Sequence, residues 1–397
     1  MTGAPVRPGR GALAIVYLTV FLDLLGFGII LPSLPYYARA LGASGAELGV
    51  LFAAYSVAQL FGSTLLGRLS DRIGRRPVLL LSLAGSSLSM LLSGLAAGLL
   101  ALTAARATAG LFGGSIATAQ AYVADVTSRE ERARYMGLIG AAIGVGFVVG
   151  PALGAGILAL GGGFPAAAFT SAALAAVNLL FALGRLPESL PADARAQAAA
   201  RPRVTPLRTL SAAWARPGLP PLLGALFCTT LAFVGLETTL AYLTKDRFGL
   251  DERRFGLLLV YAGLVLIVVQ GGLIGRLTGR FGVRPVAVAG GMLMGACLGG
   301  LPLPASPPLF VVLLGLASAG QALSSPTLST LLSHASAGDE HGALLGAGQS
   351  ASAAARAIGP LLAGPLYDVH PAAPYLVGGA LAILAGLLVR VTPREAL

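Results

Sequence analysis

Long stretches without any charged residue are the feature that most restricts how this chain of 397 residues can fold. Two examples extend from Val78 to Leu102 and from Met136 to Leu183. Only helices and closed barrels satisfy their backbone hydrogen bonds in lipid, and barrel strands contain only about ten residues. Because 56% of the residues are hydrophobic and 11% are charged, a water-soluble fold is excluded. We therefore predict an all-α membrane protein that crosses the bilayer several times.

Twelve apolar segments, each about long enough to cross a hydrocarbon core of about 30 Å, lie between charged clusters and Gly/Pro-rich turns. They occupy Ala12–Tyr37, Glu47–Gly67, Pro77–Ala97, Leu99–Ala124, Tyr135–Leu160, Phe164–Gly184, Gly218–Thr244, Phe255–Gly275, Pro285–Pro302, Pro307–Ser333, Ala343–Leu366 and Pro371–Val389. The sixth and seventh are separated by a run rich in Arg, Ala and Pro, which is typical of a linker. The predicted domains are a six-helix bundle at 1–184, a cytoplasmic linker at 185–217 and a six-helix bundle at 218–397.

The basic residues predict the orientation of the chain in the membrane. Of the 27 Lys and Arg residues, 20 fall on the loops and termini of one face, 5 on the other face and 2 inside the apolar segments. Since Lys and Arg accumulate on the cytoplasmic side, both termini are predicted to be cytoplasmic. No nucleic-acid partner is predicted from the net charge of +11, because the arginines are not interleaved with aromatic residues. The predicted partners are the lipid bilayer and a small-molecule substrate.

The two halves of the chain resemble each other. The segment Gly67–Pro77, GRLSDRIGRRP, corresponds to Gly275–Pro285, GRLTGRFGVRP. The pair Gly150-Pro151 in the fifth segment likewise corresponds to Gly359-Pro360 in the eleventh. A parallel duplication of a six-span unit places a substrate cavity near the middle of the membrane, where the two halves meet. The sequence thus predicts twelve transmembrane helices in two pseudo-symmetric six-helix bundles.

The first copy of the repeated segment contains the pattern Gly67-x-Leu69-x-Asp71-Arg72-x-Gly74-Arg75-Arg76. It resembles the signature between the second and third spans of the major facilitator superfamily, and the chain as a whole is similar to that superfamily's twelve-span drug:proton antiporters, which include the tetracycline exporters. We expect Gly67 and Gly74 of this gating loop to permit a tight turn, and Asp71 and the arginines to form ion pairs that hold one access state. Asp125, with the arginine cluster at 129–134, is expected to complete these pairs. The alternative interpretation of the gating-loop charges is that they only set the orientation of the chain in the membrane. The alternative for Asp125 and the cluster at 129–134 is a run of solvated surface charges.

The fifth segment contains Gly137-x8-Gly146-x3-Gly150-Pro151-x2-Gly154. This spacing resembles the antiporter motif, which in the family accompanies export. Its small residues are expected to let the helix approach a partner across the interface of the halves, and its proline favours a bend. Two further patterns, Leu25-Gly26-x5-Pro32-x2-Pro35 and Leu102-x3-Arg106-x3-Gly110, resemble the first-span and fourth-span motifs of the same antiporters. General packing of small residues, in a chain with 55 glycines, is the alternative for the fifth segment.

Four ionisable residues lie inside the predicted spans: Asp23, Arg106, Glu237 and Arg356. Charged side chains inside a membrane are costly and are functional by default. Asp23 and Arg356 fall near the middle of the membrane, whereas Arg106 and Glu237 share a depth of about 10 Å from the outer end of their spans. The hypothesis is that Asp23 or Glu237 binds the coupling proton, and that Arg106 alters the proton affinity and changes partner as substrate enters. A static ion pair, or a side chain that extends to the membrane edge, is the alternative.

Six further polar residues lie on helices that are expected to line the cavity, namely Tyr55, Gln59, Gln120, Gln270, Gln321 and Gln349. Each of them either contacts the substrate or forms a hydrogen bond between packed helices. No metal site is predicted, because the 3 histidines and 2 cysteines form no cluster with the spacing of metal ligands. No cofactor is predicted either, and the expected coupling ion is H⁺.

The resemblance implies a monomeric, proton-coupled exporter of small amphipathic compounds or drugs, located in the inner (plasma) membrane and acting by alternating access. Tetracycline exporters typically carry an acidic residue in the third span, where this chain has Ser89. Transport of a metal–tetracycline chelate is therefore left open. A facilitator or proton symporter for a small metabolite is the alternative within transport. A membrane enzyme or a sensor is the alternative outside it, although the sequence contains no catalytic cluster at either membrane face.

Overall fold

The computed structural model describes residues 10–191, 195, 211, 213–216, 218–335 and 341–393. Up to residue 191 the chain forms α1 (Arg10–Ile30), α2 (Leu34–Ala40), α3 (Gly45–Ile73), α4 (Arg75–Leu95), α5 (Leu99–Phe112), α6 (Ser115–Val126), α7 (Arg129–Ala159) and α8 (Phe164–Arg185). From residue 218 onward it forms α11 (Leu219–Phe248), α12 (Glu252–Val268), the π-helix η1 (Val269–Leu273), α13 (Ile274–Phe281), α14 (Val283–Gly300), α15 (Pro307–His334), α16 (His341–Val369) and α17 (Ala373–Val391). These ranges contain no β-strand, and the all-α membrane fold predicted from the sequence is confirmed.

Eleven helices in the described residues are long and apolar enough to cross a membrane. The predicted eleventh span, 343–366, forms α16, which is not one of these eleven although it contains 29 residues. Because α16 is rich in Gly and Ala and includes Gln349 and Arg356, its composition is less apolar than that of the others. The twelve predicted spans therefore correspond to eleven apolar helices and one more polar helix of similar length.

Three of the spans are interrupted within the membrane-crossing length. The first, Ala12–Ala40, combines α1 and α2, and the fourth, Leu99–Val126, combines α5 and α6, which are separated only by Gly113 and Gly114. The eighth, Glu252–Phe281, contains the single π-helical turn η1. Broken helices free backbone polar groups, and in transporters such breaks are tolerated where the backbone lines a site.

Two compact units are distinguished by the contacts within the chain. Unit 1 comprises the described parts of Met1–Gly42, Ala54–Pro202 and Asp251–Val260, and unit 2 comprises those of Ala43–Ala53, Arg203–Leu250 and Tyr261–Leu397. Consequently α3 begins in unit 2 and continues in unit 1, whereas α12 begins in unit 1 and continues in unit 2. The predicted domain boundaries stay a prediction, and most of the predicted linker at 185–217 lies outside the described residues.

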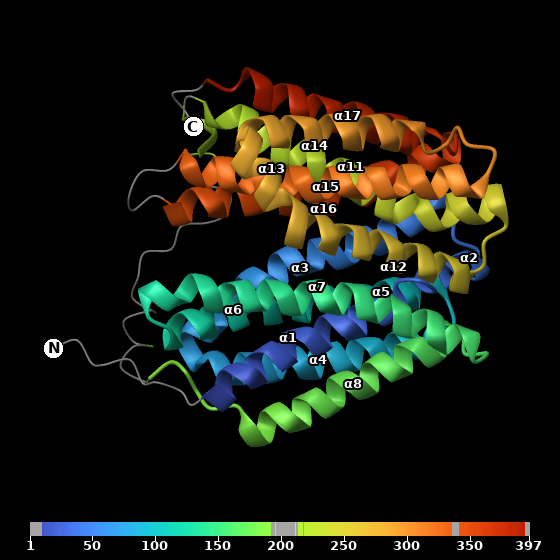
Figure 1. The fold of residues 1–397 in the computed structure, drawn as a ribbon. Helices are drawn as coiled ribbons and strands as arrows, with labels where there is room; N and C mark the ends of the chain where they lie inside the picture. Colours follow the sequence, from blue (N-terminus) through green and yellow to red (C-terminus); the bar gives the residue numbers. More distant parts are fainter. Residues whose placement is uncertain are drawn as a thin grey trace. The chain divides into compact units, whose positions relative to one another are not determined.

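The helices of the two units repeat one packing pattern (Figure 1). In unit 1, α1 packs against α7 and α8, and α4 packs against α8 and α5. In unit 2, α11 packs against α16 and α17, and α14 packs against α17 and α15. These are the same pairs when the helices are counted along each half of the chain. The repeat that the sequence shows at two short segments therefore extends to the helix packing of each unit.

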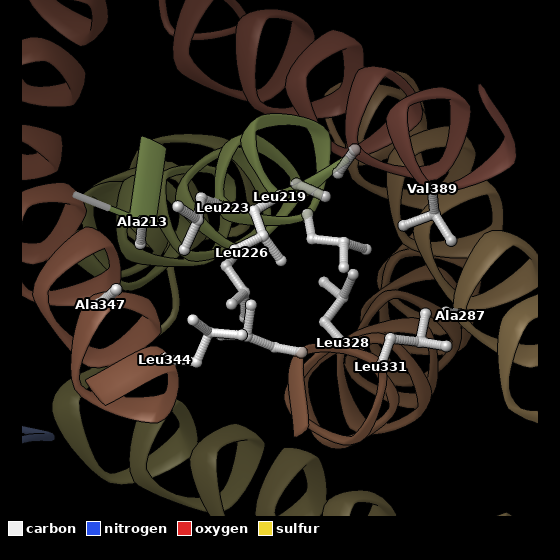
Figure 2. Packing of buried hydrophobic residues seen from close by; sticks show 14 of the residues in the cluster. Ala213, Leu219, Leu223, Leu226, Ala287, Leu328, Leu331, Leu344, Ala347 and Val389 are labelled. Atoms are coloured by element: carbon white, nitrogen blue, oxygen red, sulfur yellow. The ribbon is translucent and has the colours of Figure 1, made fainter. Parts of the chain in front are cut away.

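Leucine side chains from several helices form a buried cluster within unit 2 (Figure 2). Leu219, Leu223 and Leu226 have helical spacing on α11, which places them on one face of that helix. They pack with Leu328 of α15 and Leu344 of α16. With Ala287 of α14 and Val389 of α17, the cluster joins five helices of unit 2 through apolar packing, without any charged partner among its members.

Candidate functional site

The carboxylate of Asp23 on α1 is held by two serine hydroxyls in unit 1. Ser86 of α4 donates to Oδ1 at 3.1 Å, and Ser115 donates to Oδ2 at 2.5 Å. Ser115 is the first residue of α6 and directly follows the break at Gly113 and Gly114, so the interruption of the fourth span brings this hydroxyl to Asp23. Asp23 thus has neutral hydrogen-bond donors on both oxygens, and these donors come from two other helices.

Arg106 on α5 is buried, with an exposed fraction of 2%. Its Cζ atom lies 4.6 Å from the ring centroid of Tyr55 on α3 and 5.4 Å from that of Phe27 on α1. Its Nε and Nη1 atoms are enclosed but have no hydrogen-bond partner among the described residues. Asp23 and Arg106 belong to the same unit, and the described structure contains no ion pair between them. Two charged groups in the membrane-spanning part of unit 1 are therefore held separately.

Glycine determines how closely α5 approaches α3 beside Arg106. A Cβ atom at Gly110, one turn after Arg106, would lie 2.9 Å from the Cβ of Ala58 and 3.0 Å from the backbone nitrogen of Gln59. Only a glycine fits this contact without displacement of the backbone. The Gln59 amide in turn donates to the Tyr55 hydroxyl at 3.1 Å. Two of the predicted cavity residues, Tyr55 and Gln59, therefore lie together next to Arg106.

The other two ionisable residues of the spans, Glu237 on α11 and Arg356 on α16, belong to unit 2. Both side chains are exposed in the structure. The positive charge of Arg356 acts electrostatically on Glu237, although the described residues include no ion pair between them. The four ionisable residues thus divide into one acid and one arginine in each unit.

The remaining predicted cavity residues occupy different environments. Gln321 on α15 is partly buried and its Oε1 atom has no hydrogen-bond partner among the described residues. Gln270 is exposed and lies within the π-helical turn η1, and such turns often occur at functional sites. Gln120 on α6 and Gln349 on α16 are also exposed. Gln120 belongs to the same unit as Arg106, whereas Gln270, Gln321 and Gln349 belong to unit 2.

The gating loop centres on one arginine. Arg75 donates to Asp71 at 2.6 Å and to Asp125 at 2.9 Å, so both predicted acids meet on the same guanidinium. Arg75 is the first residue of α4 and follows Gly74, whose φ of 110° makes the turn between α3 and α4. Gly67, in contrast, lies inside α3 and a Cβ there would have no neighbour within 4 Å. The expectation that both glycines form the turn is therefore wrong for Gly67, because α3 extends to Ile73.

Other basic residues of this region have separate contacts. The Arg72 side chain is exposed at the end of α3. Arg76 donates to the carbonyl of Leu183 at 2.8 Å. Arg132, from the cluster at 129–134, donates to the carbonyl of Ala124 at 2.8 Å rather than to an acid of the gating loop. The ion pairs that the sequence predicted thus form through Arg75 alone among these arginines.

Glu188, which follows α8 and binds the start of α4, was not identified as a site residue from the sequence. Its carboxylate accepts hydrogen bonds from the backbone nitrogen of Arg75 at 2.8 Å and of Arg76 at 3.2 Å. Arg195 lies 3.7 Å from the same carboxylate. A carboxylate at a helix N-terminus satisfies free N–H groups and interacts favourably with the helix dipole. Its proximity to α4 is a tertiary contact, and an acid after the sixth span is the only sequence signal that points to it.

The glycines of the antiporter motif pack α7 against α1. A Cβ at Gly150 would lie 2.7 Å from the Cα of Gly28, and one at Gly146 would lie 2.8 Å from the Cβ of Leu24. Gly154 likewise approaches the backbone of α1, whereas Gly137 has no neighbour within 4 Å. Pro151 lies inside α7, which is continuous from Arg129 to Ala159. These glycines were expected to approach a partner across the interface of the halves, but their described neighbours are on α1.

Apolar helices in two repeated sets, with charged groups inside their spans, define a multi-pass membrane transporter. Residues 16–274 and 268–396 match the model of the Major Facilitator Superfamily, and the chain belongs to this superfamily. It is 32% identical to tetracycline resistance protein, class C, of Escherichia coli, over 94% of each chain. It is 28% identical to multidrug resistance protein 2 of Bacillus subtilis, over 92% of this chain and 91% of that protein. The crystal structure of the human organic anion transporter MFSD10 (TETRAN) matches with a TM-score of 0.71 at 29% identity, and covers 96% of this chain and 99% of that one.

Proposed function

We propose that this protein is a proton-coupled exporter of small amphipathic compounds that acts by alternating access, as a monomer in the inner membrane with both termini in the cytoplasm. The observation that carries the proposal is the environment of Asp23, a carboxyl group inside a span whose hydrogen-bond partners among the described residues are the hydroxyls of Ser86 and Ser115. The similarity to tetracycline and multidrug resistance proteins supports export as the direction.

Protonation of Asp23 changes what its neighbours can do. A carboxylate accepts hydrogen bonds on both oxygens, whereas a carboxylic acid donates through one of them. On protonation, one serine contact must therefore reverse or break, and the two serines lie on α4 and α6. The protonation state of Asp23 is thereby linked to the contacts of α1 with two other helices. This is the local change that coupling to a proton gradient requires.

Two alternatives differ in measurable ways. A facilitator equilibrates its substrate whatever the pH gradient, and a proton symporter moves substrate and proton in the same direction. The human protein MFSD10 is called an organic anion transporter, which gives no direction of transport for this chain. Export by exchange for protons is distinguished from both alternatives by the sign of the proton flux that accompanies the substrate.

The test uses the purified full-length protein in proteoliposomes that contain a pH-sensitive dye and are acidic inside. A panel of lipophilic drugs, including tetracyclines, is added to wild type, Asp23→Asn and Glu237→Gln, with Asp251→Asn as a control at an exposed acid next to α12. We expect at least one compound to release protons through wild type and the control, and Asp23→Asn to abolish this release. Substrate equilibration without proton movement, unchanged in Asp23→Asn, would reject proton coupling.

A further inference from the structure

The Arg106 guanidinium forms no ion pair with any described residue, and its Nε and Nη1 atoms have no hydrogen-bond partner there. The guanidinium group remains protonated under all ordinary conditions and carries five N–H donors. Arg106 is 2% exposed, so water does not solvate most of this charge. A buried charge without a partner is among the most destabilising features that a protein can contain. A charge that is kept in this position without a partner indicates that a partner binds there.

The two aromatic rings next to Arg106 compensate for only part of the free-energy cost of burying its charge. Tyr55 and Phe27 attract the guanidinium through their ring faces, at 4.6 Å and 5.4 Å from Cζ. Ring faces do not replace the hydrogen bonds that Nε and Nη1 lack among the described residues. A guanidinium presents two donor edges that match the two oxygens of a carboxylate, namely Nε with Nη2 and Nη1 with Nη2. Each edge includes one of the two unpartnered nitrogens.

The nearest acid along α1 is already occupied. Asp23 precedes Phe27 by one helical turn, but Ser86 and Ser115 donate to its two oxygens and it forms no ion pair with Arg106. The acids of the gating loop, Asp71 and Asp125, are bound to Arg75. The described residues of unit 1 thus place no carboxylate on Arg106.

We propose that Arg106 is the binding site for an anionic group of the transported compound, and that the preferred substrates carry a carboxylate on an aromatic or apolar body. The apolar body is matched by Phe27, Tyr55 and Phe147, because Phe27 contacts both other rings. The amide of Gln59, which donates to the Tyr55 hydroxyl, adds a polar group on the same side of α3 as that ring. This inference rests on the proposed function, since it specifies which chemical group of a small amphipathic substrate is bound.

The test measures equilibrium binding to the purified full-length protein in detergent at one pH, without a proton gradient. Three fluorescent probes share one naphthyl body and differ in charge: 2-naphthylacetate, the neutral 2-naphthylacetamide and the cationic 2-(2-naphthyl)ethylammonium. We expect wild type to bind the acetate at least about tenfold more tightly than the amide, as a charge-assisted hydrogen bond requires. In Arg106→Gln this preference should disappear, and in Arg106→Lys, which keeps the charge but loses the planar donor edges, it should be reduced.

Arg280→Gln is the matched control. Arg280 also lies over an aromatic ring, 5.3 Å from the centroid of Phe281, but its side chain is exposed. Its loss should leave the preference for the acetate unchanged, which separates a specific site from general attraction to a chain with a net charge of +11. Equal affinity of wild type for acetate and amide, or a preference that survives Arg106→Gln, would overturn the proposal, as would the absence of acetate binding by wild type.

A second variant covers the case in which Arg106→Gln does not yield folded protein. Phe27→Leu removes one ring and keeps Arg106, so it should weaken binding of all three probes while the preference for the acetate persists. Loss of the preference in Phe27→Leu would contradict the assignment of the anion to Arg106. Because no proton gradient is present, failure of this binding test leaves proton-coupled export standing. Selective anion binding without proton-coupled flux would instead reject the proposed function alone.

Discussion

The segment Gly67–Pro77 in unit 1 and its counterpart Gly275–Pro285 in unit 2 have the same backbone arrangement but different side-chain contacts. In both, a single glycine with positive φ separates two helices, Gly74 with φ 110° and Gly282 with φ 85°. Residues with a Cβ atom avoid this backbone region, so each copy requires glycine at the turn. The turn itself is thus a property of the duplicated unit.

A second shared feature ties each turn to the last helix of its own unit. Arg76 donates to the carbonyl of Leu183 near the end of α8 at 2.8 Å. Arg284, at the corresponding position, donates to the carbonyl of Arg390 near the end of α17 at 2.6 Å. Carbonyl groups in the last turn of a helix have no partner within the helix, so these arginines satisfy them. This contact also belongs to the architecture that both units share.

The charged cluster is present in only one copy. Arg75, which binds Asp71 and Asp125 in unit 1, corresponds to Val283, and Asp71 corresponds to Gly279. Since unit 2 forms the same turn without these charges, the fold of a six-helix unit does not require them. The comparison therefore supports the interpretation of the cluster as a gating device, and it provides an internal control for each of its residues.

The largest difference in stability between the two copies is expected when Arg75 and its counterpart Val283 are each replaced by the other residue type. Arg75→Val leaves Asp71 and Asp125 without a cation. The Arg75 side chain is 10% exposed and that of Asp71 is 43% exposed. We therefore expect the free energy of unfolding to fall by roughly 1–3 kcal/mol, which lies between the values for surface and buried ion pairs. Val283→Arg disrupts no ion pair, but Val283 is partly buried and packs against the leucine cluster of unit 2, so this variant should cost about 1 kcal/mol.

The measurement is the midpoint of thermal unfolding in detergent, followed by size-exclusion chromatography after heating. The substrate flux of both variants is measured in parallel, and only Arg75→Val should reduce it. Addition of Asp71→Gly to Arg75→Val removes one of the two unpaired acids. The stability loss of the double variant should therefore be smaller than the sum of the stability losses of the two single variants. Equal effects of Arg75→Val and Val283→Arg on flux would show that the charged cluster has no special role in transport.

A smaller difference in stability between the two copies is expected when the turn glycines, Gly74 and Gly282, are replaced by alanine. Gly74→Ala and Gly282→Ala both force a Cβ atom into the positive-φ region, at roughly 1–3 kcal/mol each. At Gly282 the nearest atom to this Cβ would be Cδ of Pro285 at 3.8 Å, whereas at Gly74 it would collide with the carboxylate of Glu188. Displacement of Glu188 removes a helix cap, so Gly74→Ala should be the more damaging variant by about 1 kcal/mol.

A third variant, Glu188→Ala, tests whether loss of the helix cap causes the difference between the two glycines. In this background the cap is already absent, so Gly74→Ala should lower the unfolding midpoint by the same amount as Gly282→Ala does in wild type. A difference between the glycines that persists without Glu188 would locate its cause elsewhere, in the ion pairs of Arg75. The same heating assay serves for all of these variants.

Glycine and charge patterns allowed part of this region to be predicted from the sequence. The repeat predicted equivalent turns, and the acids Asp71 and Asp125 were expected to pair with arginines of the gating loop. The pattern placed Gly67 at the turn because charged residues follow it, but α3 continues to Ile73. Charged side chains at the end of a span do not end the helix, because they reach water from the membrane edge. Local composition therefore marks the edge of the membrane rather than the end of a helix.

The residues of the candidate site were likewise only partly predicted from the sequence. The four ionisable residues of the spans were identified from the sequence, because charges in apolar segments are conspicuous. Ser86 and Ser115 were not identified, since serine is common in these spans and the break after Gly113 determines where Ser115 points. The rings around Arg106 are similarly ordinary residues in an apolar chain. Which neutral residues surround a buried charge depends on tertiary packing, and spacing along one helix does not contain that information.

The smallest difference between the copies is expected at the shared arginines. Arg76→Gln and Arg284→Gln each remove hydrogen bonds from a guanidinium to carbonyls at the end of the last helix of a unit. A single bond of this kind contributes about 0.5–1.5 kcal/mol to the free energy of unfolding. Arg76 donates to one carbonyl, whereas Arg284 also donates to the carbonyl of Thr392 at 2.6 Å, so Arg284→Gln should lose up to about twice as much as Arg76→Gln. If these contacts belong to the duplicated architecture alone, the unfolding midpoint should shift more in Arg284→Gln than in Arg76→Gln, and substrate flux should change in neither variant. A selective loss of flux in Arg76→Gln would extend the proposed gating function from Arg75 to its neighbour, and the two copies would then differ in function even where they make the same kind of contact.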